Sequence, residues 1–322
     1  MITQRQNRPR LLMYDHWEQN AIDLISPIID ICPLNGNPRF PLPGFAGLVS
    51  SLNIPVDSTV IDGLPDLRFV ASCTTGLDHI DTAYATSKGV RVISLQGHTH
   101  LKDIWATAEH TWSLLLALAR KLPFAHNDVI RGRWDRESWR GSELRGKTLG
   151  IIGLGRVGTQ VATFASAFGM RTVSCGLHKA GFFFTSEDGT TKTVSAQADA
   201  VRSVLSVSDV VTVHVALTDQ TRRMISSAQF EDMANGKIPY FVNTSRGAVV
   251  DEKALLNALL AGQVRGAALD VTECEPHIWS DLLDYAEKHD NLIVTPHLGG
   301  NTHESREKTQ IIIANEILAF LR

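Results

Sequence analysis

The stretch from Gly146 to Ala162, GKTLGIIGLGRVGTQVA, constrains the fold of this chain more than any other. Its first part, Thr148–Ile152, is a short apolar run that is typical of a buried strand in a parallel sheet. Gly153, Gly155 and Gly158 follow in the pattern G-x-G-x-x-G, and apolar residues at helical spacing come next. A strand, a glycine turn and a helix start in this order indicate a site for a dinucleotide.

Each glycine has a physical role in that interpretation. Gly153 allows the tight turn, Gly155 lets a pyrophosphate approach the backbone, and Gly158 lets the helix pack close to the strand. The phosphates then lie at the helix N-terminus, beside Arg156 and Val157, where unpaired N–H groups and the helix dipole favour an anion. The alternative is a glycine-rich turn that binds nothing, which the motifs further along the chain disfavour.

Composition excludes several other classes of protein. A net charge of −3 over 322 residues gives no reason to expect a nucleic-acid or anionic-membrane partner. The four cysteines are scattered without metal-site spacing, so we expect reduced thiols and no metal. The longest apolar run, Leu114–Ala119, is far short of the ~20 residues of a membrane span. The polar, basic N-terminal stretch lacks the apolar region of a signal peptide, so we expect a cytoplasmic protein.

Strands alternate with helices up to about residue 100, which indicates a small α/β domain. Trp105–Leu122 is the longest helical pattern, and Pro123 is predicted to end it. A helix so apolar on several sides lies either between domains or at a subunit interface. From Lys147 onward a repeated βα pattern predicts a doubly wound domain, and Glu304–Leu321 is predicted to be a last helix that returns to the first domain. The six strands of the doubly wound domain are predicted at 148–152, 171–175, 210–214, 240–243, 267–270 and 292–295.

Residues with useful chemistry follow three of these strands. Arg246 follows one strand, Asp270 ends the next, and His297 follows the last, with Glu275 in the intervening segment Glu273–Pro276. In open parallel sheets, ligands bind outside the carboxyl ends of the strands, where the glycine loop also lies. Singly, each residue is read more easily as an ordinary surface or loop residue. Together, beside a dinucleotide loop, they indicate a catalytic site.

Several segments resemble the D-isomer-specific 2-hydroxyacid dehydrogenases. They are the glycine loop Gly146–Ala162, FVNTSRGAVVDEKALLNALLAGQVRGAALDVTECEP at 241–276, TPHLGGNT at 295–302, LRFVASCTTGLDHID at 67–81 and ATAEHTWSLLLALAR at 106–120. The resemblance implies two Rossmann-like domains. The smaller, flavodoxin-like and discontinuous substrate domain would take residues 1–104 and 298–322, and the doubly wound dinucleotide-binding domain would take 105–297.

The resemblance also implies a role for each matching residue. Arg246 would bind the carboxylate and carbonyl of a 2-oxo acid through its planar fork of donors, His297 would be the acid/base, and Glu275 would orient it. Backbone N–H groups near Thr75, Gly76 and Leu77 would meet the substrate carboxylate, and Asp270 would lie beside the nicotinamide. The implied cofactor residues are Gly153, Gly155, Arg156, Val157, Gly158, His178, Lys179, His214, Ala216, Thr244, Ser245, Asp270, Gly299 and Gly300.

The chain departs from the family pattern in three places. Gly176 stands where an acidic residue usually binds the ribose hydroxyls, so the cofactor is NAD or NADP, and His178 with Lys179 favours NADP slightly. Residues 181–194 form a longer segment than the family usually has, and its Asp-Gly pair predicts a hairpin. The substrate loop 72–76 contains no arginine, which argues against a phosphorylated substrate, although His98, His100 and Lys102 are available to replace it.

Two functions remain in competition. The first is an oxidoreductase of small 2-oxo and D-2-hydroxy acids, which the family resemblance suggests is a homodimer. The second is a dinucleotide-sensing, corepressor-like binding protein on the same scaffold. The presence of Arg246, Glu275 and His297 favours the enzyme, because a sensor needs none of them.

Overall fold

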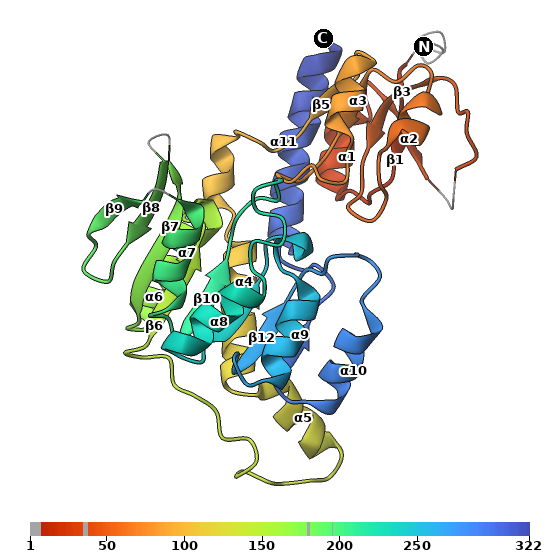
Figure 1. The fold of residues 1–322 in the computed structure, drawn as a ribbon. Helices are drawn as coiled ribbons and strands as arrows, with labels where there is room; N and C mark the ends of the chain where they lie inside the picture. Colours follow the sequence, from red (N-terminus) through yellow and green to blue (C-terminus); the bar gives the residue numbers. More distant parts are fainter. Residues whose placement is uncertain (1–7, 35–37, 179–180, 195) are drawn as a thin grey trace. The chain divides into compact units, whose positions relative to one another are not determined.

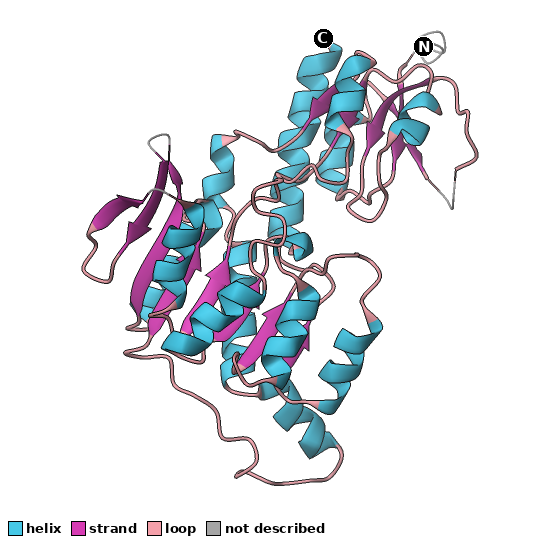
Figure 2. Cartoon of the chain, in the orientation of Figure 1, coloured by secondary structure: helices cyan, strands magenta, loops and turns pink. Residues whose placement is uncertain are grey.

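The computed structural model describes residues 8–34, 38–178, 181–194 and 196–322. It divides the chain into two compact units (Figures 1 and 2). The small unit comprises the residues up to Ile104 together with Asn301–Arg322, and the large unit comprises Trp105–Gly300. Each unit is an α/β structure built on its own sheet, which confirms the predicted fold class.

The small unit contains a five-stranded sheet in which every neighbouring pair is parallel. Its order, β2-β1-β3-β4-β5, is the flavodoxin-like order. Apolar runs such as LLM in β1 and FVA in β4 are wholly buried, which explains why they form central strands. The elements are β1 (Arg10–Met13), α1 (Gln19–Ile25), β2 (Asp30–Pro33), β3 (Phe45–Val49), α2 (Ser58–Asp62), β4 (Phe69–Ala71), α3 (Thr82–Ser87), β5 (Arg91–Ile93) and a 3₁₀ turn, η2 (Thr99–Asp103).

The last helix, α11 (His303–Leu321), belongs to the small unit and packs along α1. Its Ile313 and Ile317 are fully buried in the same apolar cluster as Leu11 of β1. The side-chain oxygen of Gln310 accepts a hydrogen bond of 2.7 Å from the N–H of Glu18, just before α1. The C-terminal segment therefore completes the core of a unit whose other residues come from the start of the chain.

The large unit contains an eight-stranded sheet in the order β13-β12-β11-β10-β6-β7-β8-β9. Six strands, from β13 to β7, are parallel, and the chain order reverses between β10 and β6. This reversal is the kind of switch point where doubly wound folds bind ligands. The strands are β6 (Thr148–Ile152), β7 (Arg171–His178), β8 (Gly181–Thr185), β9 (Thr191–Val194), β10 (Val210–Val213), β11 (Tyr240–Asn243), β12 (Gly266–Leu269) and β13 (Leu292–Val294).

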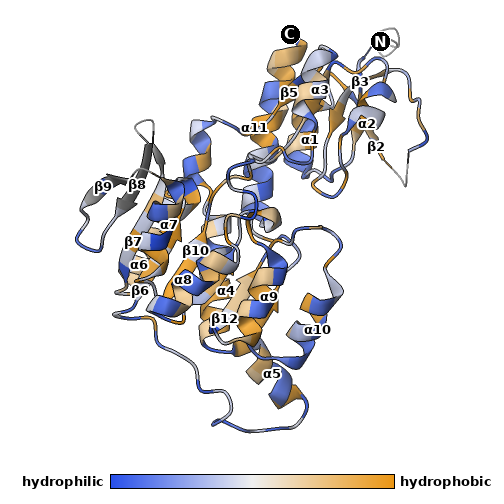
Figure 3. Cartoon of the chain, viewed as in Figure 1, coloured by the Kyte–Doolittle hydropathy of each residue, from blue (hydrophilic) through white to orange (hydrophobic). Residues whose placement is uncertain are grey.

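Helices cover both faces of this sheet, and alternate strand residues contact opposite layers. Val210 packs with α4 (Ala106–Ala119) and α6 (Arg156–Ala167), whereas Val211 packs with a layer formed by four other helices. Those helices are α7 (Gln197–Leu205), α8 (Ser227–Gly236), α9 (Glu252–Leu260) and α10 (Ser280–Lys288). Figure 3 shows the apolar strands of this sheet and the alternation of apolar and polar residues along the helices that cover it. Among the described residues, no helix is long and apolar enough to cross a membrane.

The hairpin predicted from Asp188-Gly189 is present. β8 and β9 pair in antiparallel register, and Gly189 has a positive φ of 82° in the turn. β8 also pairs antiparallel with β7, so the hairpin extends the sheet rather than standing apart from it. From the sequence, Phe182, Phe183 and Phe184 could cover the adenine end of the cofactor, contact a neighbouring subunit or, as the favoured reading, pack in the core; their side chains lie outside the described part of the chain.

The prediction that Pro123 ends the long helix is wrong. α4 already ends at Ala119, and Lys121 adopts a left-handed backbone with a φ of 52°. Pro123 instead lies in the first turn of a second helix, α5 (Leu122–Ile130), where its missing N–H is not needed. This helix was not predicted, because Phe124–Lys147 reads as a polar and aromatic segment. Beyond it, Trp139 donates a hydrogen bond to Asp128 of α5, whereas Trp134 is 84% exposed.

Candidate active site

The glycine loop of the large unit has the geometry expected of each glycine. Gly153 has a φ of 98°, and a Cβ there would lie 2.8 Å from the backbone of His214. A Cβ on Gly158 would lie 2.2 Å from the carbonyl oxygen of Gly153, so only glycine allows α6 to pack this closely. A Cβ on Gly155 would meet nothing within 4 Å. The open space at Gly155, next to the first N–H groups of α6, fits the diphosphate of a dinucleotide.

A pocket of about 290 Å³ adjoins this loop. It lies between the ends of β6, β7 and β10 and the start of α7, on the side where the adenosine half of a dinucleotide binds in this fold. None of the described residues that line it has a charged side chain. The lining residues are Ile152, Gly153, Cys175, Gly176, Gln197, Ala200, Val201, Val215, Ala216, Thr218, Gln220, Thr221 and Met224.

His214 lies just after β10, behind the glycine loop. Its Nε2 is buried and has no hydrogen-bond partner among the described residues. Burial lowers the pKa of this histidine to about 3, so the imidazole is neutral at neutral pH. Of the two residues predicted to favour NADP, His178 is the last residue of β7 and its side chain is not described, and Lys179 is outside the described residues.

His297 and Glu275 are in direct contact. Nδ1 of His297 lies 2.6 Å from Oε2 of Glu275, and Oε1 of Glu275 accepts the N–H of Thr272 at 3.0 Å. Because a carboxylate only accepts hydrogen bonds, Nδ1 carries the proton, and Nε2 is the atom left for exchange with a substrate. His297 has a φ of 56°, a left-handed conformation that is unusual for a residue other than glycine.

Arg246 follows β11, and Asn243 shapes the turn that presents it. The buried Asn243 accepts hydrogen bonds from the N–H and the hydroxyl of Ser245, at 3.0 and 2.7 Å. It also donates one of 2.9 Å to the carbonyl oxygen of Arg246. The half-buried guanidinium of Arg246 donates from Nη1 to the carbonyl oxygen of Ser245 at 2.8 Å. The side chain of Asn243, the last residue of β11, therefore fixes the direction of the backbone at Arg246.

Gly247 joins the arginine turn to the segment that contains Glu275. A Cβ on Gly247 would lie 1.9 Å from the carbonyl carbon of Thr272 and 2.5 Å from the nitrogen of Glu273. The N–H of Glu273 in turn donates a 2.6 Å hydrogen bond to the buried Glu252, the first residue of α9. The two loops are in backbone contact, so neither shifts without the other.

Asp270, at the end of β12, holds the loop of His297. Its carbonyl oxygen accepts the N–H of His297 at 2.8 Å, and its carboxylate accepts the N–H groups of Leu298 and Gly299 at 2.7 and 2.8 Å. Burial acts to raise the pKa of Asp270. Hydrogen bonds from His110, Thr295 and Leu298 outweigh it, and the pKa lies below its ordinary value.

The remaining predicted residues of the large unit lie beside these loops. Thr244 is buried, and its hydroxyl lies 2.7 Å from that of Thr111 on α4. A Cβ on Gly299 would lie 3.1 Å from the carboxylate of Asp270, whereas a Cβ on Gly300 would meet nothing within 4 Å. Among the described residues, no three His, Cys, Asp or Glu side chains are grouped so as to hold a metal ion.

In the small unit, the predicted substrate loop presents backbone groups. Thr74 donates its hydroxyl to the carbonyl oxygen of Gly76 at 2.7 Å, and Gln96 donates to that of Thr75 at 2.9 Å. These contacts engage the carbonyl side of the loop. Within the described residues, none accepts the N–H of Thr75, Gly76 or Leu77, so the loop offers donors of the kind that bind an anion.

Comparisons with a family model and with known proteins show what this chain is similar to. The family model "D-isomer specific 2-hydroxyacid dehydrogenase, NAD binding domain" matches residues 112–299. The glyoxylate reductase of Thermococcus litoralis is 33% identical over 98% of this chain and 94% of its own length. The D-3-phosphoglycerate dehydrogenase of Archaeoglobus fulgidus is 38% identical over 86% of this chain and 50% of its own length. The chain thus spans about half the length of the phosphoglycerate dehydrogenases it matches.

The chain belongs to the D-isomer specific 2-hydroxyacid dehydrogenase family.

Solved structures in this family share the whole fold. The D-lactate dehydrogenase of Aquifex aeolicus, complexed with NAD and lactic acid, has a TM-score of 0.76 at 26% identity and covers 97% of this chain and 95% of its own. The NADPH-dependent glyoxylate/hydroxypyruvate reductase of Sinorhizobium meliloti, in complex with NADP and malonate, has a TM-score of 0.79 at 25% identity, covering 98% and 94%. Both NAD and NADP therefore occur in solved structures that this chain resembles.

The predicted site omitted the residues that hold its loops. Asn243 and His110 were treated as parts of a strand and an apolar helix face, and Glu252 as part of a helix. A buried polar residue in an otherwise apolar run is the signal that could have found the first two, because such a group requires a partner. Glu252 gave no such signal, since an acidic residue in the first turn of a helix is common.

Proposed function

We propose that this protein transfers hydride between a nicotinamide dinucleotide and a small 2-oxo or D-2-hydroxy acid. The observation that carries the proposal is the 2.6 Å contact between His297 and Glu275 at the carboxyl edge of the sheet that also presents Arg246. A histidine held through one nitrogen by a carboxylate, with the other nitrogen left for a substrate, is suited to general acid–base chemistry.

The glycine loop and the uncharged pocket fit a dinucleotide. We assign its diphosphate to the N–H groups around Gly155, Arg156 and Val157 and its adenosine half to the pocket at Gly176 and Ala216. When bound, the nicotinamide supplies or accepts the hydride. We assign the nicotinamide end to the segment around Asp270, Gly299 and Gly300, with Thr244 and Ser245 beside it.

The reaction then depends on two cationic groups of the protein. We propose that the guanidinium of Arg246 binds the substrate carboxylate and polarises the carbonyl oxygen. During reduction, Nε2 of the imidazolium of His297 gives its proton to that oxygen, and during oxidation Nε2 takes the proton back. Glu275 stays ionised, accepts from Nδ1 throughout, and balances the charge of the imidazolium.

We propose that the N–H groups of Thr75, Gly76 and Leu77 also bind the substrate carboxylate. Their lack of acceptors in the described chain supports this role. The loop 72–76 contains no arginine, and the chain aligns over nearly its full length with glyoxylate reductases. Both observations favour a small, unphosphorylated 2-oxo acid.

The cofactor is proposed to be NADP in preference to NAD, with a modest difference. Gly176 supplies no carboxylate for the ribose hydroxyls, and no acidic side chain lines the described pocket. The glyoxylate/hydroxypyruvate reductase of S. meliloti, a structural relative, is described as NADPH-dependent. The kcat/KM values for NADH and NADPH measure the preference, and a strong preference for NADH would contradict it.

We also propose a cytoplasmic homodimer. The exposed apolar side chains of Leu122, Ile130 and Trp134 in and after α5 support a second copy of the chain as the partner. Sedimentation of the protein, compared with a variant carrying Ile130→Asp and Trp134→Ser, measures the oligomeric state. A monomeric wild type would contradict the proposal.

The decisive experiment is a screen of NADH and NADPH oxidation against a panel of 2-oxo acids, with chiral analysis of the product. We expect turnover of at least one small 2-oxo acid, yielding the D-hydroxy acid. His297→Ala should lower kcat by about 10²–10⁴-fold and leave cofactor binding largely intact. His277→Ala, at an exposed histidine close by, is the control. Cofactor binding without turnover of any acid would instead favour the dinucleotide-sensing protein.

A further inference from the structure

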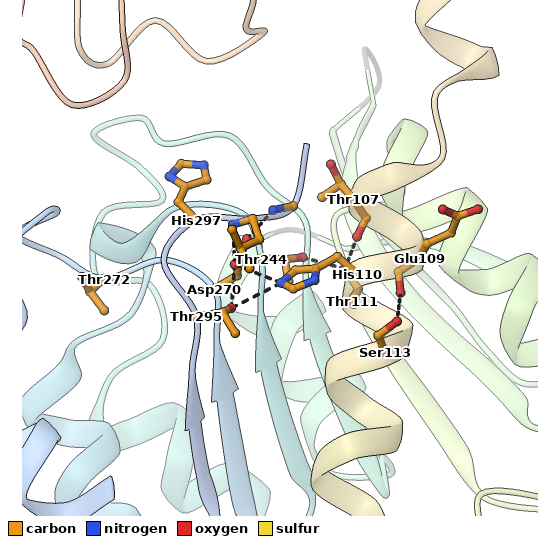
Figure 4. A network of polar contacts seen from close by, with 12 residues as sticks. Thr107, Glu109, His110, Thr111, Ser113, Thr244, Asp270, Thr272, Thr295 and His297 are labelled. Atoms are coloured by element: carbon orange, nitrogen blue, oxygen red, sulfur yellow. Dashed lines mark hydrogen bonds and ion pairs between the residues drawn. The ribbon is translucent and has the colours of Figure 1, made fainter. Parts of the chain in front are cut away.

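His110 on α4 is a polar residue of the large unit that the proposed reaction does not use. Its Nε2 lies 3.0 Å from Oδ1 of Asp270 and 3.3 Å from the hydroxyl of Thr295. Figure 4 shows the imidazole pointing from the helix toward the ends of the strands that bear these two residues. The side chain of Asp270 is fully buried, whereas that of His110 is 19% exposed.

The chemistry of the partners determines which atoms donate. The carboxylate of Asp270 only accepts, so Nε2 of His110 carries a proton and donates it to Oδ1. The hydroxyl of Thr295 donates to the same oxygen at 2.6 Å, and the N–H of Leu298 does so at 2.7 Å. Oδ2 accepts the N–H of Gly299. His110 is thus the donor that reaches this carboxylate from outside the loop of His297.

The backbone of His297 needs such support. A left-handed conformation at a residue with a side chain persists only where its surroundings determine it. Here Asp270 provides three contacts: its carbonyl oxygen binds the N–H of His297, and its carboxylate binds the next two N–H groups. A rotation of the carboxylate about its side-chain torsion would break the last two contacts and release the loop.

The same helix also contacts the arginine turn. Thr111, the residue after His110, places its hydroxyl 2.7 Å from that of Thr244, and both threonines are buried. The hydroxyl of Thr111 donates its proton to the carbonyl oxygen of Thr107 on the same helix at 2.7 Å, so it accepts from the hydroxyl of Thr244. Two successive residues of α4 therefore touch the loops of His297 and Arg246.

We propose that His110 is a positioning residue: through its hydrogen bond to Asp270 it fixes the loop of His297 in the conformation that directs Nε2 to the substrate. This inference rests on the proposed function for its catalytic consequence. It makes no use of His110 as a proton donor to the substrate. Its effect is on the geometry of another residue, and a displacement of about 1 Å in a reacting group lowers a rate by about 10²-fold.

The test compares His110→Phe, which removes the donor, with His110→Gln, whose amide N–H reaches the place of Nε2. Ser113→Ala, on the exposed side of α4, removes a hydroxyl that contacts only its own helix and is the matched control. We expect His110→Phe to lower kcat about 10- to 100-fold with less than about a threefold change in KM for the acid. His110→Gln should restore kcat to within about fivefold of wild type.

A second readout separates this inference from the proposed reaction. In protein with ¹³C-labelled histidine, the Cε1–H resonance of His297 should shift in His110→Phe and return toward its wild-type position in His110→Gln. This spectrum needs no turnover, so it tests the positioning role even if no acid in the panel reacts. If His110→Phe does not fold, Thr295→Val, which removes another donor to the same oxygen, takes its place in both measurements.

Two results would overturn the inference. One is wild-type kcat together with an unshifted His297 resonance in His110→Phe, or in Thr295→Val where that variant replaces it. The other is an equal loss in His110→Phe and His110→Gln, because the imidazole ring rather than its donor would then matter.

Discussion

The predicted substrate loop of the small unit and the strand ends of the large unit offer different kinds of chemistry. In the loop at Thr75–Leu77, the available groups are backbone N–H donors, and neighbouring side chains engage only the carbonyl oxygens. In the large unit, the groups proposed to act on the substrate are the side chains of Arg246 and His297, and the loop of each is held by a buried polar residue at a strand end. Hydrogen bonds from backbone N–H groups remain when a side chain is substituted, whereas the hydrogen bonds of a charged side chain are lost when that residue is substituted.

Among the further substitutions in the large unit, Arg246→Gln should have the largest effect on kcat/KM. The substitution removes a cation and its paired donors, and hydrogen bonds to charged groups contribute about 1.5–3 kcal/mol each. We expect kcat/KM for the acid to fall about 10²- to 10³-fold, measured by steady-state oxidation of NAD(P)H. Arg265→Gln, at an exposed arginine before β12, should keep kcat/KM near wild type. An unaffected Arg246→Gln variant would remove Arg246 from the substrate site.

Gly176→Asp should restore the acidic residue that the family usually has at this place in β7. An aspartate there can accept from both ribose hydroxyls and repels a 2′-phosphate. The ratio of kcat/KM for NADH to that for NADPH should rise about 10- to 100-fold, which corresponds to one or two charge-assisted hydrogen bonds. Gly176→Ala is the control for the added Cβ. An unchanged ratio would mean that the ribose does not lie beside residue 176.

The buried titratable groups of the large unit predict its response to acid. The pKa of His214 is about 3 in the folded protein against 6.5 as the ordinary value. The unfolded chain therefore binds a proton below pH 6.5 that the folded protein does not, and stability falls as the pH drops from 6.5 toward 3. In denaturant titrations, the free energy of unfolding of the wild type should fall by roughly 2 kcal/mol more than that of His214→Leu between pH 6.5 and 4.5. An equal fall in the free energy of unfolding of both proteins would show that His214 is not the group responsible.

Thr75→Val should have the smallest effect. The substitution removes an exposed hydroxyl but retains the backbone N–H that the small unit is proposed to use. We expect kcat and KM to stay within about threefold of wild type, in the assay used for Arg246→Gln. A loss as large as that of Arg246→Gln would show that the loop acts through its side chains, and the contrast between the two units would disappear.

Local patterns predicted those elements that local interactions determine. β6 and β11 were predicted to the residue, because each is a short, mainly apolar run bounded by glycine, proline or polar residues. α5 was missed, because Pro123 is compatible both with the end of one helix and with the start of another. The addition of β8 to the edge of the sheet also could not be read from the sequence, since an Asp-Gly turn specifies a hairpin and not its neighbour.

The same distinction applies to the site. The strand-end rule brought Arg246, Asp270 and His297 to one edge of the sheet, and that placement follows from topology alone. The hydrogen bond from His110 to Asp270 joins residues 160 positions apart, and no periodicity records such a pairing. At helical spacing, His110 simply continued the apolar face of α4.

The backbone contact at Gly247 has a consequence for any redesign of this protein. Thr272 leaves no room for a side chain on Gly247, so the segments that contain Arg246 and Glu275 must keep their relative position. If only one of the two segments were replaced by that of a relative, the backbone contact between them would no longer fit. Residues 243–275 should therefore be exchanged together, and random libraries should leave position 247 unchanged.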